Sequence, residues 1–143
     1  MKWKKLGKLF CPEGDHSWMA SHAAVPIADN LEGDIFRIFF TSRDKSNRSS
    51  TNFIDIDLES PLKIKQLTTK PVLSHGKLGC FDDSGAMGSC ILNLNNTKWL
   101  YYIGWNLGKT VPFRNSIGLA EWNSKEEIFT KKFNGPIMDR TKD

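Results

Sequence analysis

The chain repeats itself, and this repetition restricts the fold more than any other feature of the sequence. The segment 37–44 resembles 99–106, at an offset of 62 residues. Further along, 52–55 matches 116–119 at an offset of 64, and 70–72 matches 135–137 at an offset of 65. Three landmarks that recur in the same order at nearly constant spacing predict a duplicated structural unit.

Each copy has the pattern of short β-strands. Residues 35–42 form a near-continuous apolar run, whereas 51–58 alternate apolar residues with Asp55 and Asp57. Clusters of Asn, Asp, Gly and Ser separate such runs and favour turns, and no stretch shows a sustained helical period. The pattern predicts strands at 20–28, 35–42, 51–58 and 62–67 in the first unit, and at 87–94, 99–105, 115–122 and 127–133 in the second.

Four short strands in each repeat are typical of a β-propeller blade, and a β-sandwich is the main alternative. The internal copy favours the propeller, because a sandwich needs no repetition. We therefore predict an all-β propeller fragment over 1–143, with blades of four antiparallel strands at about 15–72 and about 80–137. Two blades cannot close a ring. The sequence thus predicts an N-terminal part of a longer protein, with the remaining blades as partners, or self-association of several chains.

The charge distribution argues against a nucleic-acid partner. The net charge of +4 arises from four lysines among the first ten residues, because the other 16 basic residues balance the 16 acidic ones. A nucleic-acid-binding protein needs many cations along one surface. No apolar run is long enough to cross a membrane, so we expect no membrane partner either.

Cysteine usage and missing motifs exclude several classes of site. Cys11, Cys80 and Cys90 are odd in number and lack a zinc-binding spacing, and the basic start is not followed by the apolar stretch of a secretory signal. We predict a cytoplasmic protein whose reduced thiols pack as small hydrophobic residues. The three histidines are scattered, and no phosphate loop, dinucleotide fingerprint or nucleophile elbow is present. We expect neither a metal nor another cofactor.

Several segments taken together resemble a known superfamily. They are Trp18–Ala23, Ser42–Asp44 with Asn47–Ser49, Gly79–Gly85, Tyr101–Trp105, Pro112–Ala120 and Gly135–Ile137. In this order they are similar to the five-bladed β-propeller glycosidase-like superfamily, which includes glycoside hydrolase families 32, 43, 62 and 68. The resemblance implies the first two blades of such a propeller, with a carbohydrate as the ligand or substrate.

The resemblance to glycosidases leaves catalysis open. In the resembled enzymes the innermost strands of the first two blades each supply an Asp, and the third blade supplies a proton-donating Glu. Here the predicted inner strands 21–26 and 86–90 contain no carboxylate, although glycoside hydrolysis usually needs two carboxyl groups. Three functions stay open: an enzyme acting on a sugar or polysaccharide, a non-catalytic carbohydrate-binding module, and a protein-interaction propeller fragment.

Three residues are candidates for catalysis. Asp82 and Asp83 precede the second inner strand, and consecutive strand residues point to opposite faces, so we favour Asp83 as the one that faces the funnel. A turn aspartate that accepts hydrogen bonds from its own loop is an equally good interpretation. His22 is suited to acid or base chemistry near neutral pH, although a structural histidine is the simpler alternative.

Six further residues are candidates for substrate binding: Arg43, Asp44, Arg48, Trp105, Arg114 and Asn115. Arg43 and Arg48 offer planar donor pairs to sugar hydroxyls or anions, or else form a network with Asp44 that fixes a turn. Trp105 occupies in the second unit the position of Arg43 in the first, and either stacks on a sugar face or packs between blades. Arg114 and Asn115 correspond to the turn at Arg48 and are expected to add polar contacts.

Overall fold

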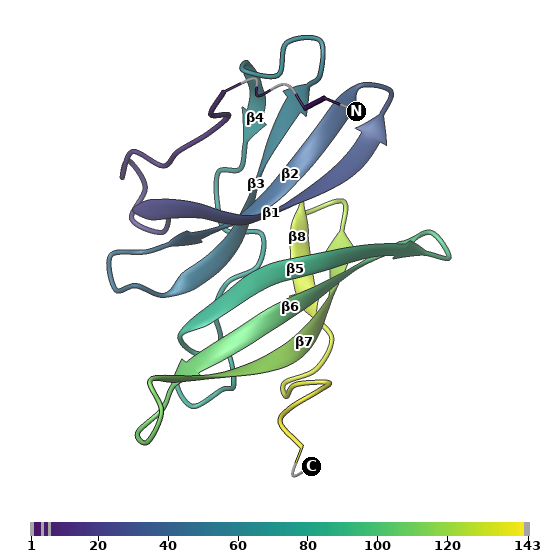
Figure 1. Cartoon of the computed structure of the whole chain (residues 1–143). Coiled ribbons are helices and arrows are strands. Elements are labelled where there is room, and N and C mark those ends of the chain that lie inside the picture. The colour runs from purple at the N-terminus through teal and green to yellow at the C-terminus, as the bar shows by residue number, and fades with distance from the viewer. Residues whose placement is uncertain (1, 4, 6, 142–143) are drawn as a thin grey trace.

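The computed structural model describes residues 2–3, 5 and 7–141, and within them the regular structure consists of β-strands without an α-helix (Figure 1). The strands are β1 (Ser21–Glu32), β2 (Ile35–Arg43), β3 (Ser49–Asp57), β4 (Ile64–Leu67), β5 (Gly85–Leu94), β6 (Thr97–Leu107), β7 (Phe113–Asn123) and β8 (Ile128–Lys131). The all-β prediction is confirmed, and every predicted strand overlaps an observed one.

The strands form two four-stranded antiparallel units, β1–β4 and β5–β8, in which each strand pairs with the next along the chain. Figure 1 shows the first unit above the second. A single parallel bridge between Ser49 and Gly85 joins β3 to β5, so all the strands belong to one mixed sheet. The sheet is open, because β1 and β8 lie at the two ends of the strand order.

The predicted repetition is present in the strand register. β1 and β5 begin 64 residues apart, as do β4 and β8. Even an irregular contact recurs, because the isolated bridge between Thr51 and Leu73 has its counterpart in Ile117 and Met138. In both units the strand N–H donates to the bridge partner's carbonyl, at 2.9 and 2.8 Å. The two units are therefore copies of one structural plan.

Tight turns set the ends of the hairpins. Asn95 and Asn96 connect β5 to β6 with φ values of 51° and 60°, the conformation of a two-residue type I′ turn. Between β1 and β2 the turn is only Gly33–Asp34, and Asn30 donates its side-chain amide to the Gly33 carbonyl at 2.8 Å. β1 therefore continues past its predicted end. Pro26 is tolerated within it because β1 is an edge strand.

The larger hydrophobic core lies between the two units. Phe39 of β2 is fully buried there, and Leu100 and Tyr102 of β6 belong to the same cluster. The Phe39 ring contacts those of Trp122 and Phe129, with centroids 5.7 and 5.4 Å apart. Both units supply this core, so each depends on the other for burial of its apolar side chains.

A second cluster covers the opposite face of the first unit. Phe40 and Ile54 are buried in it, and Leu9, Phe10 and Met19 from the N-terminal segment belong to the same cluster. The Phe10 and Phe40 ring centroids lie 5.1 Å apart. The described residues therefore bury both faces of the first unit.

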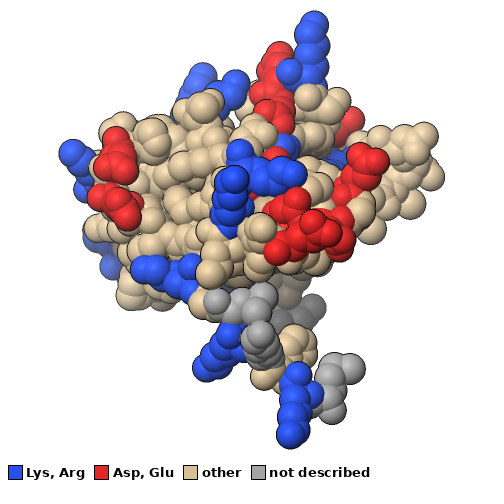
Figure 2. All heavy atoms as spheres, turned by 90° about the horizontal axis from the view of Figure 1, so that it is seen from above, with Lys and Arg blue, Asp and Glu red and all other residues tan. Residues whose placement is uncertain are grey.

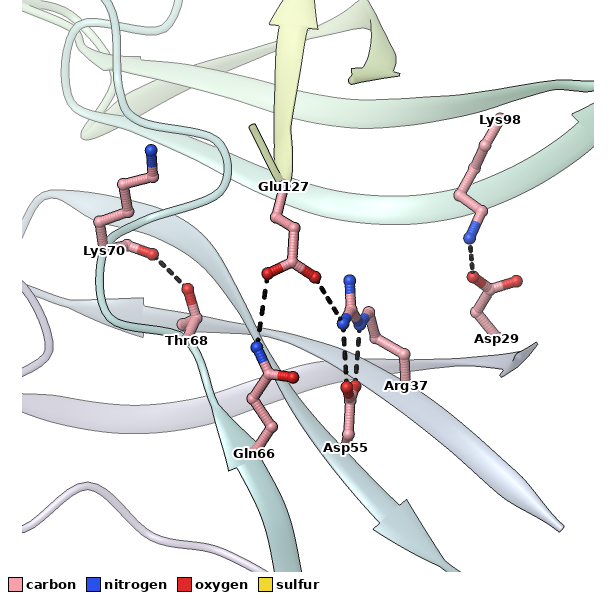
Figure 3. A network of polar contacts seen from close by, with 8 residues as sticks. All are labelled: Asp29, Arg37, Asp55, Gln66, Thr68, Lys70, Lys98 and Glu127. Atoms are coloured by element: carbon pink, nitrogen blue, oxygen red, sulfur yellow. Dashed lines mark hydrogen bonds and ion pairs between the residues drawn. The ribbon is translucent and has the colours of Figure 1, made fainter. Parts of the chain in front are cut away.

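Ion pairs also join the two units (Figure 3). Arg37 of β2 donates to Asp55 of β3 at 2.8 and 2.9 Å, and to Glu127 beside β8 at 2.9 Å. Lys98 of β6 pairs with Asp29 of β1. Burial alone would lower the pKa of Arg37, but its hydrogen bonds to both carboxylates raise that pKa above its ordinary value. The guanidinium is therefore a permanent charge at the junction.

The surface carries charges of both signs. Figure 2 shows Lys and Arg beside Asp and Glu on one face, without a continuous field of either sign.

All three cysteines are free, and Cys11 and Cys90 are exposed, so the prediction that every thiol packs as a small hydrophobic residue is wrong for these two. In the described part of the chain no helix has the length and hydropathy to span a membrane.

Candidate functional site

An open groove of about 1070 Å³ lies where the turn after β2, the loop between the units and the end of β6 meet. Its lining consists of residues 46–48, 75–78, 83–84, Trp105 and Leu107. Three of the candidate residues from the sequence come together here, namely Arg48, Asp83 and Trp105. They are far apart in the sequence, and the pairing of the two units brings them to one place.

Trp105 contributes an aromatic wall whose position is fixed. It pairs with Gly85 across β5 and β6, and a Cβ at Gly85 would lie only 2.0 Å from the indole Nε1. The indole Nε1 donates to Ser49 Oγ at 3.3 Å, and the Phe113 ring packs edge-on at 6.5 Å. The Arg43 guanidinium lies 5.8 Å from the indole centroid. An indole held in this way offers a flat apolar surface to a ligand.

Asp83 lines the groove and also shapes its own loop. Its Oδ2 accepts a hydrogen bond from the Gly79 N–H at 2.9 Å, and its Oδ1 accepts one from the Ser84 hydroxyl at 2.9 Å. The sequence left open whether Asp83 stabilises its own turn or faces a binding site, and in the structure it does both. It is a turn aspartate, and its carboxylate lies at the groove.

Asp82 is 2% exposed and is not part of the groove lining. Its Oδ2 accepts hydrogen bonds from Lys131 Nζ at 2.5 Å and from the Tyr102 hydroxyl at 3.2 Å. A Cβ at Gly76 would lie 2.1 Å from the other carboxylate oxygen, so the loop folds tightly around Asp82. Burial and the adjacent carboxylate raise the pKa of Tyr102, which keeps the phenol as a donor. The structure places the buried Asp82 carboxylate in an ion pair with the partly exposed Lys131, and this pair anchors the loop carrying Asp83.

Asp44 and Arg48 form the turn network that the sequence offered as an alternative to ligand binding. Asp44 Oδ1 accepts hydrogen bonds from the Ser46 and Arg48 N–H groups at 2.8 and 2.9 Å, and Oδ2 accepts one from Arg48 Nε at 2.8 Å. Burial alone would raise the pKa of Asp44, but these hydrogen bonds hold that pKa below its ordinary value. In the described part of the chain, the Arg48 side chain donates a hydrogen bond only through Nε, so its two terminal nitrogens remain available to a ligand in the groove.

The remaining candidates lie outside the groove lining. His22 is exposed on β1 with a φ of 65°, and its Nδ1 lies 2.8 Å from the Ser21 hydroxyl. Arg114 and Asn115 are exposed at the start of β7. Asn115 is the register partner of Trp105, but it lines a separate cavity.

The sequence analysis missed His75 and Lys77, which line the groove from the loop between the units. The His75 Nδ1 lies 2.9 Å from the Gly76 carbonyl oxygen, so the imidazole is partly engaged by its own loop. No motif marks either residue. In the sequence, the only sign that they belong to the site is that they shortly precede Asp82 and Asp83. In the structure, the loop that carries them lines the groove together with Asp83.

The groove offers an aromatic plane, a carboxylate and several hydrogen-bond donors. This set suits a ligand with an apolar face and hydroxyl groups along its edges. Asp83 is the single carboxylate that lines the groove in the described part of the chain, whereas glycoside hydrolysis usually needs two. Nowhere among the residues with described positions do three His, Cys, Asp or Glu side chains gather as a metal site.

No protein-family model matches the chain. Two curated relatives are "Uncharacterized protein MT1551" of Mycobacterium tuberculosis (strain CDC 1551 / Oshkosh) and "Uncharacterized protein Rv1502" of Mycobacterium tuberculosis (strain ATCC 25618 / H37Rv). Each is 47% identical to this chain over 120 residues, which is 84% of the chain. The chain spans only about 40% of the length of these relatives.

Among solved structures, the protein in a complex of BT0996 with RGII has a similar fold, with a TM-score of 0.59 and 18% sequence identity. The similarity covers 79% of this chain and 36% of that protein. At this level of identity the likeness concerns the fold alone. As with the mycobacterial proteins, the match covers only part of that protein.

Proposed function

We propose that the chain forms part of a carbohydrate-binding protein, and that the groove beside Trp105 holds the sugar. The observation that carries this proposal is the indole held over Gly85, next to Arg48 and Asp83. A sugar ring has an apolar face that stacks on such a plane, while its hydroxyl groups take hydrogen bonds from the charged side chains.

The proposal includes the finer fold. We infer that the two units are neighbouring blades of a glycosidase-like β-propeller, because each is a four-stranded antiparallel meander and the second repeats the first. The structure with a similar fold supports the ligand class, because its name records an RGII complex, which is a carbohydrate complex. In this interpretation the groove lies at the rim of the propeller funnel.

Glycoside hydrolysis is the second candidate function, and Asp83 is the observation that favours it. The reaction usually needs a second carboxyl group on the other side of the scissile bond. Asp44 accepts hydrogen bonds within its own turn, and Asp82 is paired with Lys131. Neither carboxylate is therefore placed for that role. The groove of this chain therefore supports binding better than catalysis.

Binding of neutral and acidic oligosaccharides, measured by calorimetry, tests the proposal. We expect Trp105→Ala to weaken the affinity at least about tenfold, because the stacking surface is removed. Trp99→Ala is the matched control, since Trp99 lies on the same strand outside the groove lining. A ligand that binds both variants equally well would contradict the proposal. A chain that binds no sugar and forms a stable complex with another protein would favour the interaction fragment instead.

A further inference from the structure

The groove beside Trp105 carries more positive than negative charge. Arg48 and Lys77 line it as cations, and across residues 2–3, 5 and 7–141 Asp83 is the one carboxylate that does so. With His75 counted as neutral, two cations and one carboxylate leave a formal charge of +1 on the lining. A ligand of opposite charge would therefore complement the groove better than a neutral one.

The Asp83 carboxylate does not pair with either of these cations. Its two oxygens accept hydrogen bonds from the Gly79 N–H and the Ser84 hydroxyl, both at 2.9 Å. Lys77 is exposed, and within the described ranges no carboxylate forms an ion pair with its ammonium group. The positive charges thus have no carboxylate partner inside the groove.

Asp44 holds Arg48 in place from outside the groove lining. The Asp44 side chain is 14% exposed, whereas that of Arg48 is 46% exposed. Asp44 Oδ2 accepts a hydrogen bond from Arg48 Nε at 2.8 Å, while Oδ1 accepts two more from the Ser46 and Arg48 backbone N–H groups. The bond at Nε orients the planar guanidinium and leaves both terminal nitrogens, which carry four of its five N–H donors, to a ligand.

This arrangement favours a carboxylate as the ligand group. Parallel N–H donors of a guanidinium match the two oxygens of a carboxylate, and such charge-assisted hydrogen bonds are roughly twice as strong as neutral ones. A neutral sugar would take water away from the cations without compensating their charge. A phosphate monoester carries about −1.5 to −2 charges at neutral pH, which exceeds the charge of the lining, whereas a carboxylate carries a single negative charge.

We propose that the groove binds a sugar that bears a carboxylate, a uronic acid, through the terminal nitrogens of Arg48. Lys77 supplies a second positive charge in the same groove. Arg43, whose guanidinium lies 5.8 Å from the Trp105 indole centroid, adds to the positive potential beside the aromatic wall. The inference rests on the proposed function, because it assigns the charge class of the sugar whose ring stacks on Trp105.

Calorimetry with matched ligands tests the charge of the sugar. Oligosaccharides of glucuronate, galacturonate and mannuronate are each compared with the same oligosaccharide after its carboxylates have been reduced to hydroxymethyl groups, which removes the charge and keeps the ring. We expect at least one acidic form to bind at least about tenfold more tightly than its reduced form. Glucose 6-phosphate and inorganic phosphate distinguish a carboxylate ligand from a phosphate, and we expect both to bind more weakly than that uronate.

Arg48→Gln locates the anion. We expect it to reduce the preference for the acidic form at least about fivefold, because Gln has neither the charge nor the paired donors. Lys109→Gln is the matched control and should leave the preference unchanged, since Lys109 is exposed after β6 and lies outside the groove lining. If Arg48→Gln disturbs its turn, Lys77→Gln still tests the charge of the groove. We expect this variant to reduce the preference by about threefold.

The outcomes separate this inference from the function on which it rests. Equal binding of acidic and reduced forms would overturn the charge class and leave sugar binding in place. A preference that survives both Arg48→Gln and Lys77→Gln would show that the carboxylate lies elsewhere. Tighter binding of glucose 6-phosphate than of any uronate would assign the groove to a phosphorylated sugar. If none of these ligands binds, both this inference and the proposed function are wrong.

Discussion

At the residue scale, the candidate site is built from carboxylates that shape loops. Asp44, Asp82 and Asp83 each accept at least two hydrogen bonds from their own surroundings. Their charges hold a turn, a partly exposed lysine and a loop in place, so the groove walls are ordered before any ligand arrives. Pre-ordered walls reduce the entropy that binding must overcome.

Asp44 gives a pH-dependent prediction at this scale. Its pKa in the folded chain lies below the ordinary value of 3.8. Such a group stabilises the fold above its unfolded pKa and loses that contribution as the pH falls through its folded pKa. We expect Asp44→Asn to lower the free energy of unfolding by about 1 kcal/mol at neutral pH, and the difference to shrink progressively as the pH falls through 3.8 towards the folded pKa. Denaturant unfolding of both proteins across a pH series measures this, with Asp34→Asn in an exposed turn as the control. A difference that does not change with acidity would contradict it.

At the scale of elements, two strand pairs approach so closely that only glycine fits. Gly85 lies under the Trp105 indole, and Gly118 of β7 lies under the Tyr102 ring. Both rings sit over the glycine that faces them across the hairpin register. The glycines therefore set where the large side chains of β6 lie, and through Trp105 they set one wall of the groove.

The strands could be predicted from the sequence because their signals are local. Alternating apolar residues in 51–58 and the Asn95–Asn96 turn act over a few neighbouring positions. The site depends on contacts between distant residues, and adjacent Asp82 and Asp83 differ only in what the fold places around them. The bond from Arg37 to Glu127 likewise joins residues 90 positions apart. No local pattern carries that information, so the groove had to be seen in the structure.

Gly118→Ala tests the close packing within the second unit. A Cβ at this position would lie 2.2 Å from Tyr102 Cζ, and Tyr102 is 1% exposed and cannot swing into solvent. We expect the free energy of unfolding to fall by about 3 kcal/mol. Gly135→Ala is the matched control, because nothing lies within 4 Å of a Cβ there. Similar melting temperatures for the two variants would contradict the packing.

At the scale of the whole molecule, the two units are held together by a shared core and by a buried charge. Arg37 stacks 3.7 Å from the centroid of Phe53 and 5.5 Å from that of Trp122, so one guanidinium contacts aromatic rings of both units. Its carboxylate partners also come from both units. The junction therefore fixes the relative placement of Ser49 and Gly85, which directly follow the groove-lining residues Arg48 and Ser84 in the chain.

Removing Arg37 should destabilise the chain because it leaves Asp55 buried without a partner. The Arg37 and Asp55 side chains are 8% and 9% exposed, whereas the Glu127 side chain is 45% exposed. We expect Arg37→Met to lower the free energy of unfolding by about 3 kcal/mol, and Glu127→Gln by less than about 1 kcal/mol. Denaturant titration followed by tryptophan fluorescence measures both.

The double variant Arg37→Met with Asp55→Leu separates the charge from the packing. Replacing a buried pair by apolar side chains of similar volume is often neutral or stabilising, since no unpaired charge remains. We therefore expect the double variant to recover most of the stability that Arg37→Met loses, while the cation–π contacts with Phe53 and Trp122 stay lost. If the double variant is as unstable as Arg37→Met alone, the stacking of the guanidinium between the rings, rather than its pairing with Asp55, holds the units together.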